Sequence, residues 1–507
     1  MDPDRRNQMT RWRSVLGAAL AAVLLGASLI APASAAPGAA QPPAQRLKWG
    51  ACAGSSTTEL RCARVKVPLD HRNPRGRKIE VMISRLPATD PAKRRGVLLS
   101  ARGGPGQGGG IYLPEDYAVL MAPEVRARYD LIGFDVRFLE QSTPITCGYP
   151  SEEPEGFWNR GAQSRSEFEL HVVEARQYAR DCQKHAGWAL PHATLENIAR
   201  DMDVIRTALG ERRISFLGAD ALGTVGAIYA TLFPRQTDRF VLDNPLDPTK
   251  LWQSSRLERI ALMEDGLDEF SAWIADRDDE FGLGDTAAQV ERNVAEMWEN
   301  APWYAGGRWW TGDELVYYTI LGVFFEAFEW RMAANLSAIR RGDAPPVQWG
   351  LYPTVRPGVL GVPIDNHTAV STAYMCAESP WRSNVESYWR DLQRYVPPFP
   401  NFGVAAANIF PCAFWSSRKD NRVTLGSRHT PPVLVLGATR NSIVPLSNVR
   451  AVATALRGSR LVVEDSRGHE LYPFFGGDCL KDRANRYLTS GDLPRADVWC
   501  PAPAQTG

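Results

Sequence analysis

A carboxylate and an imidazole stand at positions in this chain where they could act together. Asp220 lies within residues 218–222, directly after the short, mostly apolar run 215–217 and before a run of small residues with helical potential. A short apolar run, a glycine two residues ahead of a polar residue and a helix indicate a strand, a sharp turn and a helix. His469 follows a second apolar run, residues 460–464. We predict that Asp220 and His469 reach the same cavity and are catalytic residues.

Several reactions are open to such a pair. Serine hydrolases carry Ser at the tip of this kind of turn, but the pattern G-x-S-x-G occurs nowhere in the chain. Attack by a carboxylate on an amide would form a mixed anhydride, which disfavours ordinary peptide hydrolysis. An aspartate can instead attack an alkyl carbon, or it can exchange protons with a substrate together with a histidine. Glu140 is a third candidate catalytic residue for such acid/base chemistry.

Alternating apolar runs and helical segments must position these side chains. Residues 61–86 alternate like a hairpin, and buried strands are expected at 97–100, 129–135, 215–217, 240–243, 433–437 and 460–464. Helices are expected at 165–187, at 194–209 with Thr194 as the cap, and directly after the turn at Asp220. Strands that alternate with helices predict an α/β fold, in which helices cover both faces of a mostly parallel sheet.

A glycine-rich loop, residues 103–110, follows the strand at 97–100. It lacks the G-K-[ST] ending of a P-loop and the G-x-G-x-x-G spacing of a dinucleotide site. Beside a strand–turn–helix tip, such a loop supplies a backbone N–H to an oxyanion hole, and glycines let the backbone approach the substrate. We therefore place Gly103, Gly104 and Ala221 around an oxyanion hole and pocket.

The middle of the chain is helical and rich in large aromatic residues between about positions 250 and 345. Aromatic residues at helical spacing more often pack a core than line a ligand pocket. This group interrupts the sheet, however, and as a group it fits a helical lid whose underside lines a pocket. We expect a first part of the core at 36–247, a helical lid at 248–405, and a second part of the core with the histidine loop at 406–507.

The N-terminus and the cysteines point to export. Residues 1–35 combine four arginines, an apolar run and Ala33-Ser34-Ala35, the order of a signal peptide for general secretion. Eight cysteines, an even count, indicate disulfides in an exported chain. Spacing does not fix their connectivity, and our working prediction joins nearest neighbours: 52 with 62, 147 with 182, 376 with 412, and 479 with 500. We expect a secreted protein without a membrane anchor.

Charge and composition restrict the partners. The 507 residues carry a formal net charge of +1, from 58 Lys and Arg against 57 Asp and Glu, with no block of like charge. This balance gives no support for binding to nucleic acid or to an anionic membrane. The chain has no C-x-x-C pair and no His/Cys cluster at metal spacing, so we expect no metal and no cofactor. The expected partner is a small-molecule or peptide substrate, and no feature indicates an oligomeric state.

Taken together, the motifs resemble a known family. In chain order they are residues 103–106, 133–137, 194–209, 217–234, 241–243 and 468–469. They are similar to the secreted tripeptidyl aminopeptidase-like branch of the α/β-hydrolases, the prolyl-aminopeptidase-type serine peptidases of actinomycetes. The resemblance covers nearly all of the chain after residue 35. It implies an α/β-hydrolase fold with an inserted helical lid, and a family activity that releases short peptides from free N-termini.

The departures from that family fall on its catalytic residues. The family's serine lands on Asp220, and the glycine two residues further on is Leu222. The family's acid falls on Asn441 when counted back from Pro445, or on Arg440 when counted forward from Gly437. Neither residue is a carboxylate.

The pocket motifs depart from the family as well. Phe138 and Glu140 replace two glycines of the family's D-P-R-G-x-G-x-S motif, and Arg102 replaces the proline before the double glycine. We therefore assign Arg102, Phe138 and Asn441 to the pocket. Because the exchanged residues bring new charge around an intact His469, we favour altered catalysis over simple loss of activity.

Three functions remain open. The favoured one is acid/base or Asp-nucleophile chemistry on a small molecule under the aromatic lid, such as a cyclisation, an isomerisation, or an epoxide or ester-type opening. Haloalkane dehalogenases and epoxide hydrolases are similar at the elbow aspartate only, and Asp465, Glu470 or Glu140 would then have to orient His469. The alternatives are a catalytically inactive pseudo-peptidase that binds peptides or a small ligand, and a residual tripeptidyl aminopeptidase-like hydrolase.

Overall fold

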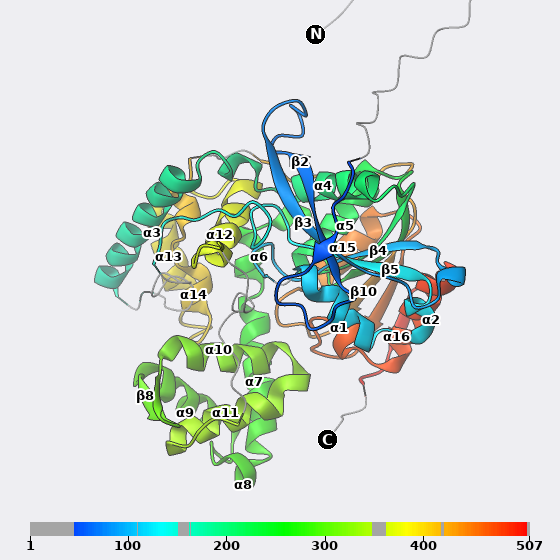
Figure 1. Ribbon diagram of the computed structural model, residues 1–507. Helices are drawn as coiled ribbons and strands as arrows, with labels where there is room; N and C mark the ends of the chain where they lie inside the picture. The colour runs from blue at the N-terminus through cyan, green and yellow to red at the C-terminus, as the bar shows by residue number, and fades with distance from the viewer. Residues whose placement is uncertain are drawn as a thin grey trace, which may run out of the picture. The chain divides into compact units, whose positions relative to one another are not determined.

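A ten-stranded sheet runs through the computed structural model, which describes residues 45–108, 110–150, 162, 164–346, 361–416 and 420–503 (Figure 1). The strand order is β1-β2-β3-β5-β4-β6-β7-β10-β11-β12. The strands are β1 (Gly50–Ala51), β2 (Arg61–Pro68), β3 (Lys78–Leu86), β4 (Gly96–Ala101), β5 (Tyr129–Phe134), β6 (Ile214–Ala219), β7 (Thr237–Asp243), β10 (Leu434–Ala438), β11 (Arg460–Glu464) and β12 (Val498–Cys500). Strands β1, β2, β3 and β5 pair antiparallel, and all the pairs from β5 to β12 are parallel. The predicted mostly parallel sheet is confirmed.

Helices cover both faces of this sheet. Successive side chains of a strand point to opposite faces, so the central strand β4 contributes to two cores. Val97 and Leu99 pack with helices α4, α5 and α15, whereas Leu98 packs with α1, α2 and α16. The bounds of these helices are α1 (Leu113–Leu120), α2 (Pro123–Arg126), α4 (Leu195–Ala208), α5 (Asp220–Leu232), α15 (Leu446–Ala455) and α16 (Asp478–Ser490). The α/β fold expected from alternating strands and helices is therefore present.

Two predicted helices are present, and the one at 194–209 begins at its expected cap. Helix α4 starts after Thr194, whose side chain accepts a hydrogen bond from the Asn197 N–H. The predicted helix at 165–187 is α3 (Arg165–Ala186), which begins with a capping box between Ser164 and Glu167. The short edge strands β1 and β12 were not predicted, because two or three residues carry no readable alternation.

The inserted helices form a cap with a core of its own. This core is built from α7 (Ile260–Ala275), α8 (Asp278–Phe281), α9 (Ala287–Glu299), α10 (Gly312–Phe324), α11 (Glu329–Arg341) and the hairpin of β8 (Trp303–Ala305) and β9 (Arg308–Trp310) (Figure 1). Phe270, Trp310 and Tyr318 are buried within it. Many of the aromatic residues thus stabilise the cap itself, which is the commoner role of aromatics at helical spacing.

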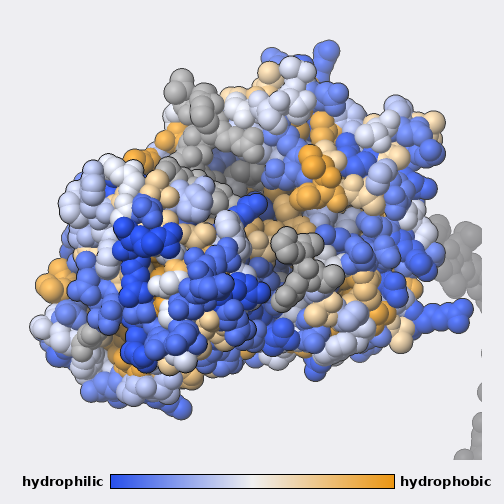
Figure 2. Space-filling model, turned by 90° about the horizontal axis from the view of Figure 1, so that it is seen from below, coloured by the Kyte–Doolittle hydropathy of each residue, from blue (hydrophilic) through white to orange (hydrophobic). Residues whose placement is uncertain are grey.

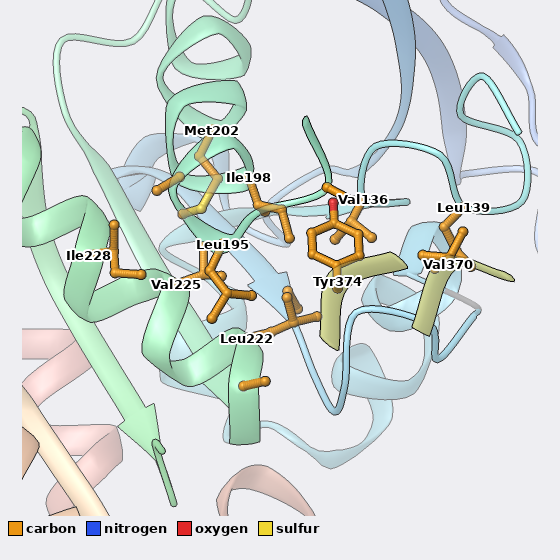
Figure 3. Packing of buried hydrophobic residues seen from close by; sticks show 14 of the residues in the cluster. Val136, Leu139, Leu195, Ile198, Met202, Leu222, Val225, Ile228, Val370 and Tyr374 are labelled. Atoms are coloured by element: carbon orange, nitrogen blue, oxygen red, sulfur yellow. The ribbon is translucent and has the colours of Figure 1, made fainter. Parts of the chain in front are cut away.

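The remaining inserted helices pack elsewhere. Helix α12 (Asn366–Glu378) joins the core of the sheet through Val370 and Tyr374 (Figure 3). Helices α13 (Val385–Tyr395) and α14 (Gly403–Ala407) form a separate cluster with α3. The short helix α6 (Gln253–Glu258) follows β7 and leads into α7. Residues 260–341 are therefore the segment with its own core, and α12 belongs to the core that packs against the sheet.

The cysteines pair as predicted. The disulfides join Cys52 to Cys62, Cys147 to Cys182, Cys376 to Cys412 and Cys479 to Cys500. Four disulfides are typical of proteins in an oxidising compartment. The predicted signal peptide, residues 1–35, lies outside the described residues. Within the described part of the chain, no helix combines the length and the apolar character needed to span a bilayer. The face shown in Figure 2 is mostly hydrophilic, with apolar residues in separate patches.

Candidate active site

The turn between β6 and α5 presents Asp220. The residue has a φ of 57°, a left-handed conformation that is uncommon outside glycine and that asparagine and aspartate adopt more readily than most residues. A Cβ at Gly223 would stand 3.0 Å from the Gly218 carbonyl oxygen and 3.2 Å from that of Asp243, so this position favours a glycine. The tight approach of helix to strand therefore depends on Gly223, one residue beyond the family position that Leu222 occupies.

Leu222 does not crowd the tip of the turn. Its side chain is buried in the core near Leu195 and Tyr374 (Figure 3). Its backbone N–H donates to the Gly103 carbonyl oxygen over 3.2 Å, which ties the start of α5 to the glycine-rich loop.

The loop after β11 brings His469 to Asp220. The Asp243 carboxylate accepts hydrogen bonds from the N–H groups of Leu471 and Tyr472, at 2.7 and 2.9 Å. The Asn244 side chain donates to the His469 carbonyl oxygen over 2.8 Å. The clamped loop places His469 Nε2 3.9 Å from Asp220 Oδ2. The two residues predicted to be catalytic therefore face each other, at a separation slightly too long for a direct hydrogen bond.

Asn441, the residue on which the family's acid was predicted to fall, lies at the imidazole, and its amide orientation is fixed by the backbone. Its Oδ1 accepts from the N–H groups of Ile443 and Val444, at 2.8 and 2.9 Å. Its Nδ2 donates to the Gly468 carbonyl oxygen over 3.1 Å and lies 3.2 Å from His469 Nδ1. Rotating the amide by 180° would set oxygen against the Gly468 carbonyl and nitrogen against two N–H donors. The Nδ2 group therefore donates to Nδ1.

This contact sets the tautomer of His469. A neutral imidazole has one N–H and one acceptor nitrogen, so Nδ1 as acceptor puts the hydrogen on Nε2. In a Ser-His-Asp triad, the acid instead accepts from Nδ1–H and leaves Nε2 free to take the nucleophile's proton. Here His469 presents an N–H to Asp220. The arrangement suits a hydrogen-bond donor and not a general base.

The pKa values of the two residues are inverted relative to free side chains. Burial raises the pKa of Asp220 to about 6, against the opposing effects of Arg259 and of a hydrogen bond from the Ala221 backbone N–H. Burial lowers the pKa of His469 to about 4; the Glu470 carboxylate opposes this shift and Arg259 adds to it. A proton that enters the site therefore goes first to the carboxylate.

The predicted oxyanion-hole and pocket residues differ in what they contact. The Ala221 N–H interacts with the Asp220 carboxylate, so the aspartate occupies a donor that a substrate oxygen would need. Gly103 lies against Gln107 and accepts from Leu222, while a Cβ at Gly104 would meet open space. Arg102 pairs with Glu470 at 2.9 Å and lies over the Phe474 ring.

Two other predicted site residues lie elsewhere. Phe138 is fully buried in the sheet core, edge-on to the Trp188 ring, because a large apolar side chain gains most from complete burial. Glu140 has a φ of 44°, and its Oε1 lies 3.2 Å from His367 Nε2 on α12. No hydrogen bond or ion pair among the described residues joins Phe138 or Glu140 to Asp220 or His469.

The residues proposed to orient His469 also have other partners. Asp465 pairs with Arg440 at 2.7 Å, and Glu470 pairs with Arg102. Of the two candidates for the acid position, Asn441 is thus the one at the imidazole, and Arg440 turns away toward Asp465 and Glu269.

Sequence reasoning missed three residues around the site. Arg259, directly after α6, acts electrostatically on both Asp220 and His469. The ring of Phe325 from the cap lies edge-on to the His469 ring, with centroids 6.0 Å apart. Arg467 binds the cap, as described next. A cation or an aromatic residue within a helical insertion gives no sequence signal of what it faces, although the aromatic-rich lid did suggest contacts of the Phe325 kind.

The cap is fastened to the histidine loop by Arg467. Its guanidinium pairs with Glu269 at 3.1 Å and with Glu329, and it donates to the carbonyl oxygens of Gly266 and Val323. The Arg467 N–H donates to Glu326 over 3.0 Å. Helices α7, α10 and α11 therefore hold the loop that carries His469.

The strand order, the elbow turn and the histidine loop define the class of the protein: it has the α/β-hydrolase fold. A family profile described as TAP-like protein matches residues 398–500. The tripeptidyl aminopeptidase of Streptomyces lividans is 29% identical over 469 residues, covering 90% of this chain and 86% of that protein. The serine protease Hip1 of Mycobacterium tuberculosis is 24% identical, covering 90% of this chain and 91% of its own.

Among solved structures, the proline iminopeptidase of Mycobacterium smegmatis matches 84% of this chain and 97% of its own, with a TM-score of 0.36 and 14% identity. The resemblance predicted from the motifs is confirmed by the sequence comparisons. The chain is an α/β-hydrolase related to the tripeptidyl aminopeptidases.

Proposed function

We propose that this chain is an exported enzyme that transfers a proton on a small molecule, with Asp220 as the proton carrier and His469 as a neutral hydrogen-bond donor. The observation that carries the proposal is the Asn441 amide at His469 Nδ1, which leaves the hydrogen on Nε2. The four disulfides are compatible with an extracellular location.

The proposed reaction has two proton steps. At pH 7 the Asp220 carboxylate, with a pKa of about 6, is mostly ionised and accepts a proton from a substrate C–H or O–H bond. The electron pair of that bond moves into the substrate, and His469 Nε2–H donates to the oxygen on which negative charge develops. Asp220 then returns the proton to another atom. An isomerisation, a cyclisation or an elimination results, and no covalent intermediate is needed.

Asp-nucleophile chemistry is less well supported. It requires a histidine base that activates water against the ester formed on the aspartate. A His469 with a pKa of about 4 and its hydrogen on Nε2 is poorly suited to that step. Single turnover in heavy-oxygen water, followed by peptide mass measurement, separates the two: label in the Asp220 carboxylate supports the ester, and unlabelled enzyme after turnover supports proton transfer.

A pseudo-peptidase that binds without turnover is the second candidate. The observation in its favour is the Ala221 N–H, which interacts with Asp220 and not with an open oxyanion hole. The same contact counts against residual tripeptidyl aminopeptidase activity. If the parent hydrolyses a tripeptidyl chromogenic substrate and Asp220→Ala does not, the peptidase hypothesis would be supported.

Hydrogen exchange tests the main proposal. The protein would be incubated in heavy water with a small-metabolite library, and deuterium uptake would be measured by mass spectrometry. We expect uptake into at least one compound, lost in Asp220→Asn and kept in Asp465→Asn, a matched control whose carboxylate pairs with Arg440. Deuterium uptake that persists in Asp220→Asn, or no uptake into any compound that binds, would contradict the proposal and favour the pseudo-peptidase.

A further inference from the structure

Two neighbouring arginines, of which Arg259 acts on the site and Arg256 lies behind it on α6, have no carboxylate partner of their own. Arg256 lies on α6 and is 6% exposed; it donates to the Ala405 carbonyl oxygen and stacks on the Phe410 ring. Arg259, one turn further on, has a buried Nε without a hydrogen-bond partner. Neither guanidinium forms an ion pair with a carboxylate of the described residues.

The neighbouring carboxylates already have partners. Glu258 pairs with Lys250 at 3.1 Å, Asp391 with Arg382, and Glu470 with Arg102 at 2.9 Å. Asp220 is the carboxylate that Arg259 acts on electrostatically. His469 is neutral near pH 7, because burial lowers its pKa. Arg256 acts electrostatically on Arg259, and Arg259 in turn acts on Asp220, so this cluster of two cations and one carboxylate has one positive charge in excess.

A buried guanidinium nitrogen without a hydrogen-bond partner is unfavourable, because it has lost its contact with water and gained no replacement. A fold tolerates such a cost where a ligand supplies the missing charge. We infer that the substrate carries an anionic group, a carboxylate or a similar oxyanion, which binds Arg259 beside Asp220. The inference deepens the proposed function, since it fixes which end of the small molecule lies against Arg259.

The contact also places the reacting atom. Arg259 acts electrostatically on both Asp220 and His469, which lie 3.9 Å apart, so an anionic group bound to Arg259 would hold the adjacent substrate atoms near both residues. Acids with a labile hydrogen near the carboxylate are therefore the expected class. This preference is opposite to that of an aminopeptidase, whose substrate presents a cationic amine.

A charge series of probes tests the inference. Binding of 3-phenylpropionate, 3-phenylpropanol and 3-phenylpropylamine would be measured by titration calorimetry at pH 7.5. We expect the propionate to bind best, and Arg259→Gln to weaken it at least tenfold while changing the alcohol less than twofold. Arg341→Gln is the matched control, since that exposed arginine pairs with Asp343 on the cap; it should leave all three unchanged.

Asp220→Asn supplies a second measurement that does not depend on the folding of the Arg259 variant. Removing the carboxylate should tighten propionate binding about tenfold, as expected when a like charge is removed at close range. In the unaltered protein the same gain should develop between pH 7.5 and 5.5, as Asp220 takes up a proton.

Three results would overturn the inference: preferred binding of the amine, equal loss of propionate and alcohol in Arg259→Gln, or no propionate binding. Each would leave deuterium exchange by Asp220 standing. Conversely, absent exchange with intact propionate selectivity would remove the proposed reaction and keep the anion site.

Discussion

Two buried histidines of this protein each face a carboxylate, yet their surroundings differ. His367 Nε2 lies 3.2 Å from Glu140, beneath the glycine-rich loop, where a Cβ on Gly108 would overlap both side chains. His469 lies 3.9 Å from Asp220, with an amide on its second nitrogen and an aromatic ring of the cap against it. The first pair is closer and the second is better organised.

The difference shows that proximity of histidine and carboxylate is a poor guide to chemistry. Neither ring nitrogen of His367 forms a hydrogen bond among the described residues, and no group on Nδ1 helps the Glu140 carboxylate near Nε2 to fix the tautomer. Glu140 also repels Asp135, whose pKa lies well above its usual range mainly through burial and then through Glu140. At His469 the tautomer, the pKa and the position of the carboxylate are all set by identifiable neighbours. A prepared protonation state, and not a short distance, distinguishes the candidate active site.

The largest expected contrast is in proton exchange. Asp220→Asn should lower deuterium uptake into any active compound by at least about 100-fold, the typical contribution of a positioned acid or base. Glu140→Gln should change it less than threefold, because Glu140 is paired with His367. Equal losses of deuterium uptake in the two variants would contradict the distinction between the two pairs and would show that Glu140 takes part in the reaction.

The pH dependence of stability should separate the two members of the site. The pKa of Asp220 is raised from 3.8 to about 6, so its stabilising contribution is complete below pH 4 and is lost as the pH rises through 6. The pKa of His469 is lowered from 6.5 to about 4, so its contribution is complete above pH 6.5 and is lost as the pH falls through 4. Each amounts to about 3 kcal/mol, and the two oppose each other.

Urea unfolding between pH 4 and 7 checks this cancellation. Asp220→Asn should gain stability with rising pH relative to the parent, and His469→Gln should lose it. The corresponding variants Glu140→Gln and His367→Gln serve as the comparison at the other pair. Parallel curves for Asp220→Asn and the parent would contradict the raised pKa of Asp220.

A smaller effect, on the pKa and tautomer of His469, is expected from changing the Asn441 amide. Asn441→Asp places a negative charge beside His469 Nδ1, which should raise the pKa of His469 by about two units and move its hydrogen to Nδ1. Nitrogen NMR of histidine-labelled protein reads both changes, and His469→Gln assigns the signal among the seven histidines of the chain. Arg440→Gln is the control, since Arg440 faces Asp465 and Glu269. An unaltered His469 in Asn441→Asp would refute the proposed tautomer.

The smallest effect concerns the other pair. Glu140→Gln should change the free energy of unfolding at pH 7 by no more than about 1 kcal/mol, because loss of the contact with His367 is offset by relief of Asp135. The pKa of Asp135 should fall in this variant. A loss of several kcal/mol would show that the Glu140–His367 pair is a principal support of the glycine-rich loop.

The sequence predicted the parts of the site that follow from periodicity and turn chemistry. The strand before Asp220 and the loop that carries His469 depend on local patterns, and the structure has both. Asn441, found by counting back from Pro445, lies at the imidazole. Phe138 and Glu140 could not be placed in the same way. Both lie in a loop with positive φ angles, where the direction of a side chain is decided by packing against residues far away in the sequence, such as Trp188 and His367.

The surroundings of the pair were also beyond sequence reasoning. Arg259 and Arg467 are ordinary surface-type residues in a helical insertion and a loop, and only the docking of the cap gives them buried neighbours. The lid was expected to line a pocket, whereas many of its aromatic residues pack its own core and Phe325 reaches the imidazole.

The Arg467 cluster has a consequence for how a substrate could enter. The Arg467 guanidinium binds three cap helices and lies two residues from His469 in the chain. An outward movement of the cap would therefore break the contact between His469 and Asn441. Opening of the cap and loss of the His469 orientation would then occur together. The open molecule would therefore be inactive toward other compounds in bulk water. The site would become active only after the cap has closed over a bound substrate.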